Sequence, residues 1–254
     1  MSSSSRTTYP SSKYVALGLM VARYLRLLGS RPETFSYISL GGTEMLDTVY
    51  LSWVDPNMLS QIVSFEEVSG RYALALQNEE RLQAKGLSVE FRQDNIFAYR
   101  RQGPEKHVFF IDLEGVCKPK PFIEHFQDWF VSEVIQPGDF VLITSYQGRN
   151  PGWNKVLEPF SSEFKLLKIT SLDQQKGIYK IAHPLFVLYR ALLSSGLEHE
   201  ISLSCTGYVK YFSTSTMGLY GIAISEGQTH LKDLVKSVPV LDLIHRDWNL
   251  LQLM

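Results

Sequence analysis

The fold is decided by a short apolar run that stops at a pair of glycines: Phe35-Ser36-Tyr37-Ile38-Ser39-Leu40-Gly41-Gly42. The run is short and β-prone, so it predicts a buried strand that enters a glycine turn. A brief helical stretch follows at about residues 44–54. The segment therefore predicts the first strand and helix of an alternating pattern.

The alternation continues through the first 150 residues. Four more apolar runs are predicted strands, at 61–65, 89–92, 107–111 and 140–143. Between them, one predicted helix begins at Ser69 as its capping residue and ends at Gly86 as a left-handed C-terminal cap. Another covers 122–134, with apolar residues at helical spacing. Nearly continuous apolar strands that alternate with helices predict a parallel sheet covered on both faces.

The last hundred residues have a different character. A predicted helix at 185–193 leads into two longer β-rich runs, at 200–212 and 217–225. These runs predict an antiparallel pair of strands at the edge of the sheet. The expected fold is therefore an α/β, doubly wound, mostly parallel seven-stranded sheet with a C-terminal antiparallel strand pair and helices on both faces.

The composition predicts one globular unit. Residues 1–12 are Ser/Thr-rich and predict a flexible tail, and 13–254 predict a single domain with a core-packed helix at 13–29. The start lacks the apolar stretch of a secretory signal, and the helix at 13–29 contains two arginines, so we expect a cytoplasmic protein that does not span a membrane. The net charge of -1 does not indicate nucleic-acid binding. Two cysteines far apart suggest no metal site.

Polar residues and glycines follow the predicted strands one after another. Gly41, Gly42 and Thr43 follow the first strand and Glu66 follows the second. Asp94 and Asn95 come after the third, and Asp112 and Glu114 after the fourth. Ligands of an open parallel sheet bind outside the carboxyl ends of the strands, so these positions predict the ligand site.

Each of these residue types suits a particular contact. The glycines allow close approach of the backbone to a ligand. The Glu66 carboxylate could accept both hydroxyls of a ribose, and it follows the glycines at about the interval of roughly 20 residues seen in dinucleotide folds. Asp94 or Asn95 could hydrogen-bond an amine or a base edge. Asp112 could meet a cationic or proton-donating group, and Glu114 could be a general base, a metal ligand or a plain loop residue.

The order of these segments resembles that of the class I S-adenosylmethionine-dependent methyltransferases. The resemblance is carried by 37–42, 64–66, 92–95 and 110–115, followed by a strand and the closing pair of β runs, and it covers about 13–225. It implies a Rossmann-like domain that binds S-adenosylmethionine.

By this resemblance, the loop of Gly41, Gly42 and Thr43 passes the methionine portion. Glu66 holds the ribose, and Asp94 with Asn95 sits by the adenine. Asp112 lies at the catalytic face.

Three hypotheses follow. The first is an O- or N-methyltransferase with an unknown acceptor, in which Asp112 or Glu114 removes or receives the acceptor proton. The second is a catalytically inactive methyltransferase-like protein that serves binding or assembly and needs a protein partner. It is motivated by Ser39, which stands where the family carries an acidic residue, and by Thr43 and Met45, which replace later glycines. The third, an NAD-type oxidoreductase, is disfavoured because the G-x-G-x-x-G spacing is absent.

Other features have a structural or an open interpretation. The six histidines are scattered and predict surface or satisfied core positions, and the aromatic stripe in 122–130 predicts core packing. Arg100-Arg101 and 118–120 flank the predicted ligand edge, as cations for an acidic substrate or as a solvated loop. The segment 146–153 has the composition of a substrate-facing loop. The tail 231–254 could cover the core or a partner, and a homo-oligomer stays open.

Overall fold

In the described part of the chain, the computed structural model contains one eight-stranded sheet in the order β3-β2-β1-β4-β5-β7-β6-β8. The description covers residues 17–18, 20–21, 34–40, 46–54, 59–84, 86–112, 119–146, 152–212, 216–236 and 240–241. The strands are β1 Phe35–Ser39, β2 Leu59–Phe65, β3 Glu90–Arg92, β4 Lys106–Ile111, β5 Phe140–Tyr146, β6 Ile201–Phe212, β7 Thr216–Glu226 and β8 Val240–Leu241.

The sheet is doubly wound, with its switch point between β1 and β4. Strands β1 to β5 are all parallel, and the chain moves outward through β2 and β3 before it returns to β4 beside β1. β7 is antiparallel to both β5 and β6. This arrangement confirms the predicted mostly parallel sheet with its C-terminal antiparallel pair. The short β8, parallel to β6, is an eighth strand that the sequence analysis did not predict.

Helices cover both faces of this sheet. They are α2 Leu46–Val54, α3 Ser69–Gln77, α4 Glu79–Gln83, α5 Pro119–Val131, α6 Trp153–Leu157, α7 Ser161–Leu166, α8 Leu172–Ser195 and α9 Leu231–Lys236, with 3-10 turns η1 Ile96–Ala98 and η2 Glu158–Phe160. The described residues 17, 18, 20 and 21 are also helical. No helix in the described ranges combines the length and the apolar character that crossing a bilayer requires.

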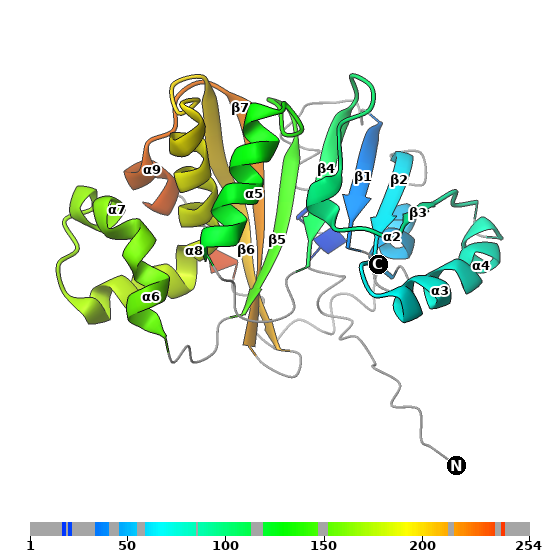
Figure 1. Cartoon of the computed structure of the whole chain (residues 1–254), viewed down its shortest axis with the longest axis horizontal. Helices are drawn as coiled ribbons and strands as arrows, with labels where there is room; N and C mark the ends of the chain where they lie inside the picture. Colours follow the sequence, from blue (N-terminus) through cyan, green and yellow to red (C-terminus); the bar gives the residue numbers. More distant parts are fainter. Residues whose placement is uncertain are drawn as a thin grey trace, which may run out of the picture.

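Two apolar clusters form because successive strand residues point to opposite faces. On β1, Ile38 belongs to the cluster beneath α5, α8 and α9, whereas Phe35 and Tyr37 belong to the cluster beneath α2 and the helical residues near 20. The helices α5 and α8 lie side by side over the first cluster (Figure 1). The predicted aromatic stripe of α5 packs here, with Phe126, Trp129 and Phe130 fully buried.

Several helix boundaries differ from the predictions. Ser69 is the first helical residue of α3 rather than its cap, and the helix expected to run to Gly86 is interrupted at Asn78. Gly86 does adopt the expected left-handed conformation, with φ of 74°.

The helix expected at 185–193 begins much earlier, at Leu172, and contains Pro184. Pro184 cannot donate to the carbonyl of Lys180, four residues before it. The Tyr220 hydroxyl on β7 donates to that carbonyl instead, at 3.4 Å. The long helix therefore continues through the proline.

The described part of the tail covers the core. Leu231 and Leu234 of α9 are buried in the first cluster, and β8 lies beside β6. Of the two readings left open for this tail, the structure supports core packing for 231–236.

Candidate functional site

The candidate site lies at the carboxyl ends of β1, β2 and β4, on either side of the switch point. Ser39, the last residue of β1, is in register with Ser64 on β2 and with Phe110 on β4. Glu66 and Asp112 each come two residues after these partners, directly beyond the ends of β2 and β4. The two carboxylates therefore leave the sheet at the same level and flank the end of β1, as the sequence predicts.

Glu66 is held in place by the backbone around it. Its backbone N–H donates to the carbonyl of Arg92 at 3.1 Å, which fixes the end of β2 against β3. Its Oε1 accepts from the backbone N–H of Val68 at 2.9 Å. Among the described residues, no hydrogen bond involves Oε2, and the side chain is half-buried. This carboxylate retains acceptor capacity for a ligand.

The loop after β3 is tied to the loop after β2. Asn95 caps η1 by accepting from the backbone N–H of Phe97 at 2.9 Å, and its amide nitrogen donates to Glu67. Asp94 is exposed and accepts from the backbone N–H of Asn95 at 2.7 Å. The structure therefore brings Asp94 and Asn95 next to the Glu66–Glu67 turn. Much of the bonding capacity of the Asn95 amide is spent on holding the loop.

Asp112 is anchored to the neighbouring strand. The Thr144 hydroxyl on β5 donates to Asp112 Oδ1 at 2.6 Å, and the carboxyl is half-buried. Gly41, Gly42, Thr43 and Glu114, the remaining predicted site residues, lie outside the described residues.

Ser39 is a buried polar residue at the centre of this edge. Its side chain is 0% exposed, and its hydroxyl has no hydrogen-bond partner within the described residues. A buried hydroxyl without a partner costs free energy, so such groups gather where a ligand or an ordered water completes the bonding.

Sequence reasoning missed a second polar pair at the same edge. Ser145, near the end of β5, lies 2.8 Å from Nδ1 of His183 on α8, measured from its Oγ. Burial lowers the pKa of His183 to about 3, so the ring is neutral at physiological pH. No local motif marks this pair, because 38 residues separate its members.

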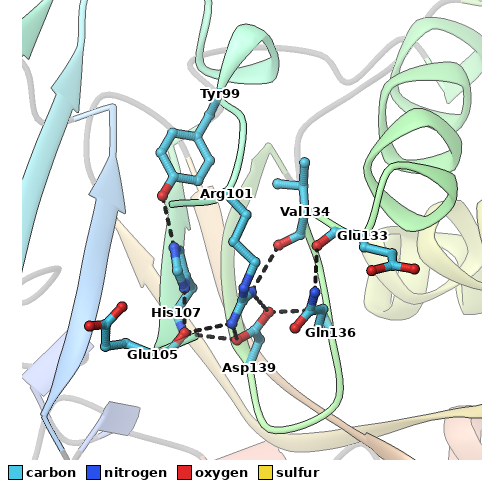
Figure 2. Close-up of polar contacts among 8 residues, drawn as sticks. All are labelled: Tyr99, Arg101, Glu105, His107, Glu133, Val134, Gln136 and Asp139. Atoms are coloured by element: carbon cyan, nitrogen blue, oxygen red, sulfur yellow. Dashed lines mark hydrogen bonds and ion pairs between the residues drawn. The ribbon is translucent and has the colours of Figure 1, made fainter. Parts of the chain in front are cut away.

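The expectation that Arg101 faces the ligand edge is wrong. Its guanidinium binds the buried Asp139 carboxylate, with Nη1–Oδ2 and Nη2–Oδ1 distances of 2.7 and 3.3 Å. Figure 2 shows this ion pair between Arg101 and Asp139. Asp139 directly precedes β5, so the pair lies at the amino edge of the sheet, whereas the candidate site lies at the carboxyl edge. Asp139 also accepts from the backbone N–H of His107 and of Gln136, both at 2.8 Å. Arg101 is therefore a structural residue.

The neighbouring His107 completes the same network. Its Nδ1 lies 2.8 Å from the carbonyl of Glu105 and its Nε2 lies 2.8 Å from the Tyr99 hydroxyl. Because a carbonyl can only accept, Nδ1 carries the proton and Nε2 accepts from Tyr99. Burial lowers the pKa of His107, which keeps the ring neutral. Within the described residues, no group of three or more His, Cys, Asp or Glu side chains gathers as metal ligands would.

Comparison with known proteins gives distant similarity only. No protein-family model and no curated protein matches the chain. Several solved methyltransferase structures align with it. An O-methyltransferase from Bacillus cereus in complex with SAH shares 15% identity, with 86% of this chain and 83% of that chain covered and a TM-score of 0.46.

Two further neighbours are of the same kind. The N-methyltransferase NodS from Bradyrhizobium japonicum WM9, in complex with S-adenosyl-L-homocysteine, shares 8% identity over 88% of this chain and 89% of that chain, with a TM-score of 0.46. An rRNA methylase from Streptococcus thermophilus shares 13% identity over 84% and 96%, with a TM-score of 0.43.

Proposed function

We propose that this protein is an S-adenosylmethionine-dependent methyltransferase that transfers a methyl group to an O or N atom of its acceptor. The observation that carries the proposal is the placement of Glu66 and Asp112 at one level on both sides of the switch point. This is where an open doubly wound sheet binds nucleotide-like ligands. The reversed strand β7 supports the proposal, since the methyltransferase resemblance includes a closing antiparallel pair and a dinucleotide dehydrogenase would not share it.

The polar groups at this edge suit the parts of the cofactor. Glu66 retains a free acceptor oxygen that would take the ribose hydroxyls, because two adjacent hydroxyls match a carboxylate. Asp94 and Asn95, tied to the same turn, would sit by the adenine. Gly41, Gly42 and Thr43, which follow Ser39 and Leu40 in the sequence, would pass the methionine portion, and the Ser39 hydroxyl has no hydrogen-bond partner among the described residues.

Methyl transfer requires that the acceptor atom be oriented toward the methyl group and that one group take up the acceptor proton. When bound, S-adenosylmethionine supplies an electrophilic methyl carbon, and the protein's contribution is largely to align the acceptor atom with it. Asp112, fixed by the Thr144 hydroxyl, would take the acceptor proton, with Glu114, two residues later in the sequence, as the alternative.

The test is calorimetric titration of the full chain with S-adenosylmethionine and S-adenosylhomocysteine. Glu66→Gln keeps the shape of the side chain and removes its charge. Removing a hydrogen bond to a charged group costs about 1.5 to 3 kcal/mol, so the affinity should fall roughly 10- to 150-fold. Glu80→Gln, an exposed glutamate of α4, is the matched control and should bind like the wild type.

The outcomes separate the two leading functions. Saturable binding that only Glu66→Gln weakens supports the ribose role and justifies a search for the acceptor. Folded wild-type protein that binds neither compound refutes the methyltransferase proposal. It would favour the noncatalytic binding or assembly function suggested by Ser39, which leaves the family's acidic position without a carboxylate.

A further inference from the structure

One ring nitrogen of His183, Nε2, is buried and makes no hydrogen bond within the described residues. The residue is 5% exposed and lies on α8, and its Nδ1 is engaged by the Ser145 hydroxyl at 2.8 Å. Its other ring nitrogen, Nε2, is buried and has no hydrogen-bond partner in the described part of the chain. A buried polar atom left unpaired destabilises a protein, so its presence here calls for an explanation.

The position of His183 is fixed by its neighbours. Pro184 follows it in the helix, and the Tyr220 hydroxyl satisfies the Lys180 carbonyl that the proline leaves open. Ser145 holds the ring from the other side, near the carboxyl end of β5. Ser145 also directly follows Thr144, which anchors Asp112. The ring nitrogen is therefore held in one orientation near the carboxyl end of β5, the same edge of the sheet at which Asp112 follows β4, although Thr144 and Ser145 point to opposite faces.

The surroundings of His183 are aromatic. The ring of Tyr179 packs against it with centroids 5.3 Å apart, and Tyr179 in turn contacts Phe160 at 5.3 Å and Trp153 at 6.3 Å. Such rings pack well against another ring, and they offer no counter-ion for a charged one. Among the described residues, no side-chain carboxylate contacts the His183 ring, so it is suited to an uncharged hydrogen-bonding partner.

We propose that His183 Nε2 is the hydrogen-bonding group for an uncharged, hydroxyl-bearing aromatic acceptor, and that the ring cluster around Tyr179 packs against the ring of that acceptor. This inference rests on the proposed function and names the substrate class of the same site. Nε2 is inaccessible to solvent, so the acceptor must displace side chains packed over the imidazole.

Phenol is the probe, and toluene is the matched compound without the hydroxyl. The full chain, labelled with 15N at histidine, is titrated with phenol by NMR in the presence and absence of S-adenosylhomocysteine. We expect a saturable change in the Nε2 resonance of His183. The ring of His107, buried at the opposite edge and already bonded at both nitrogens, is the internal control and should not respond.

The second arm isolates the hydrogen bond from apolar packing. Ser145→Ala/His183→Leu removes both polar partners together and keeps an apolar side chain of similar volume. Wild type should prefer phenol to toluene by about tenfold, and the double variant should lose this preference. An unmoved His183 resonance, or the same preference in both proteins, overturns the proposal. The wild-type titration tests the proposal even if the double variant does not fold.

The calorimetric titration with S-adenosylhomocysteine distinguishes the two failures. Cofactor binding without a phenol response refutes the acceptor role of His183 and leaves the methyltransferase proposal standing. A phenol response without cofactor binding supports the His183 site and refutes the methyl-transfer function.

Discussion

Asp139→Ala should be among the most destabilising single substitutions in this chain. Asp139 is 0% exposed and faces Arg101, whose side chain is only 10% exposed. Removing one partner of a buried ion pair typically costs 3 to 5 kcal/mol, because the other charge stays buried. In the variant, Arg101 can still donate to the carbonyls of Val134 and Glu105, which offsets part of this cost. The backbone N–H of His107 also loses its acceptor. We therefore expect a loss of about 3 to 4 kcal/mol.

Urea unfolding of four proteins tests this reasoning. They are the wild type, Asp139→Ala, Arg101→Met and the double variant. If the ion pair carries the cost, the double variant loses clearly less than the sum of the two single variants, since no charge is left alone. The difference should be about 1.5 kcal/mol or more. Single losses that add within about 0.5 kcal/mol, or an Asp139→Ala loss below about 1 kcal/mol, would refute it.

Three further predictions concern stability. The pKa of His183 is about 3 when folded and roughly 6.5 when unfolded, so stability falls as the pH drops through this window, by about 2 kcal/mol at pH 5. His183→Leu should remove this loss. Urea unfolding at pH 7 and pH 5 measures it, and an equal drop in the free energy of unfolding in wild type and variant would contradict the prediction. In thermal melts, Gly177→Ala should stabilise by about 0.5 to 1 kcal/mol, because its Cβ meets no atom within 4 Å in α8. Gly221→Ala should destabilise by about 1 to 3 kcal/mol, since its Cβ would lie 2.8 Å from a ring of β5. Shifts of the same sign would show that these contacts relax freely.

The central parallel strands β1, β4 and β5 could be predicted because they are buried on both faces. Every residue of β1 is buried, and so are all but the last of β5, which is why they appear as continuous apolar runs. α8 was only partly predicted, because Pro184 ordinarily ends a helix. Its continuation depends on the Tyr220 hydroxyl, which comes from a strand 40 residues away. The short helices α6 and α7 were missed for a related reason: their apolar residues make sense only once α8 is in place.

In the candidate site too, some positions could be predicted from the sequence, and others depend on contacts between residues far apart in the chain. Glu66 and Asp112 follow buried parallel strands, so their meeting at one edge could be deduced from topology alone. The sequence does not place Arg101 at the correct edge, because its partner Asp139 is 38 residues away and the chain between β3 and β4 returns from the carboxyl edge of the sheet to the amino edge. His183 looked like an ordinary scattered histidine. Its significance depends on the docking of α8 against β5, which no local pattern encodes.

Thr144 and Ser145 divide the proposed chemistry between a proton acceptor and a positioning group. Consecutive strand residues point to opposite faces, so Thr144 reaches Asp112 while Ser145 reaches His183. With a pKa of about 3, His183 is too weak a base to accept a proton near neutral pH, whereas its hydrogen bond can orient an acceptor. With a phenolic acceptor, His183→Gln should therefore raise KM more than it lowers kcat. Asp112→Asn should lower kcat with a smaller effect on KM, and the reversed pattern in steady-state kinetics would assign the proton transfer to His183.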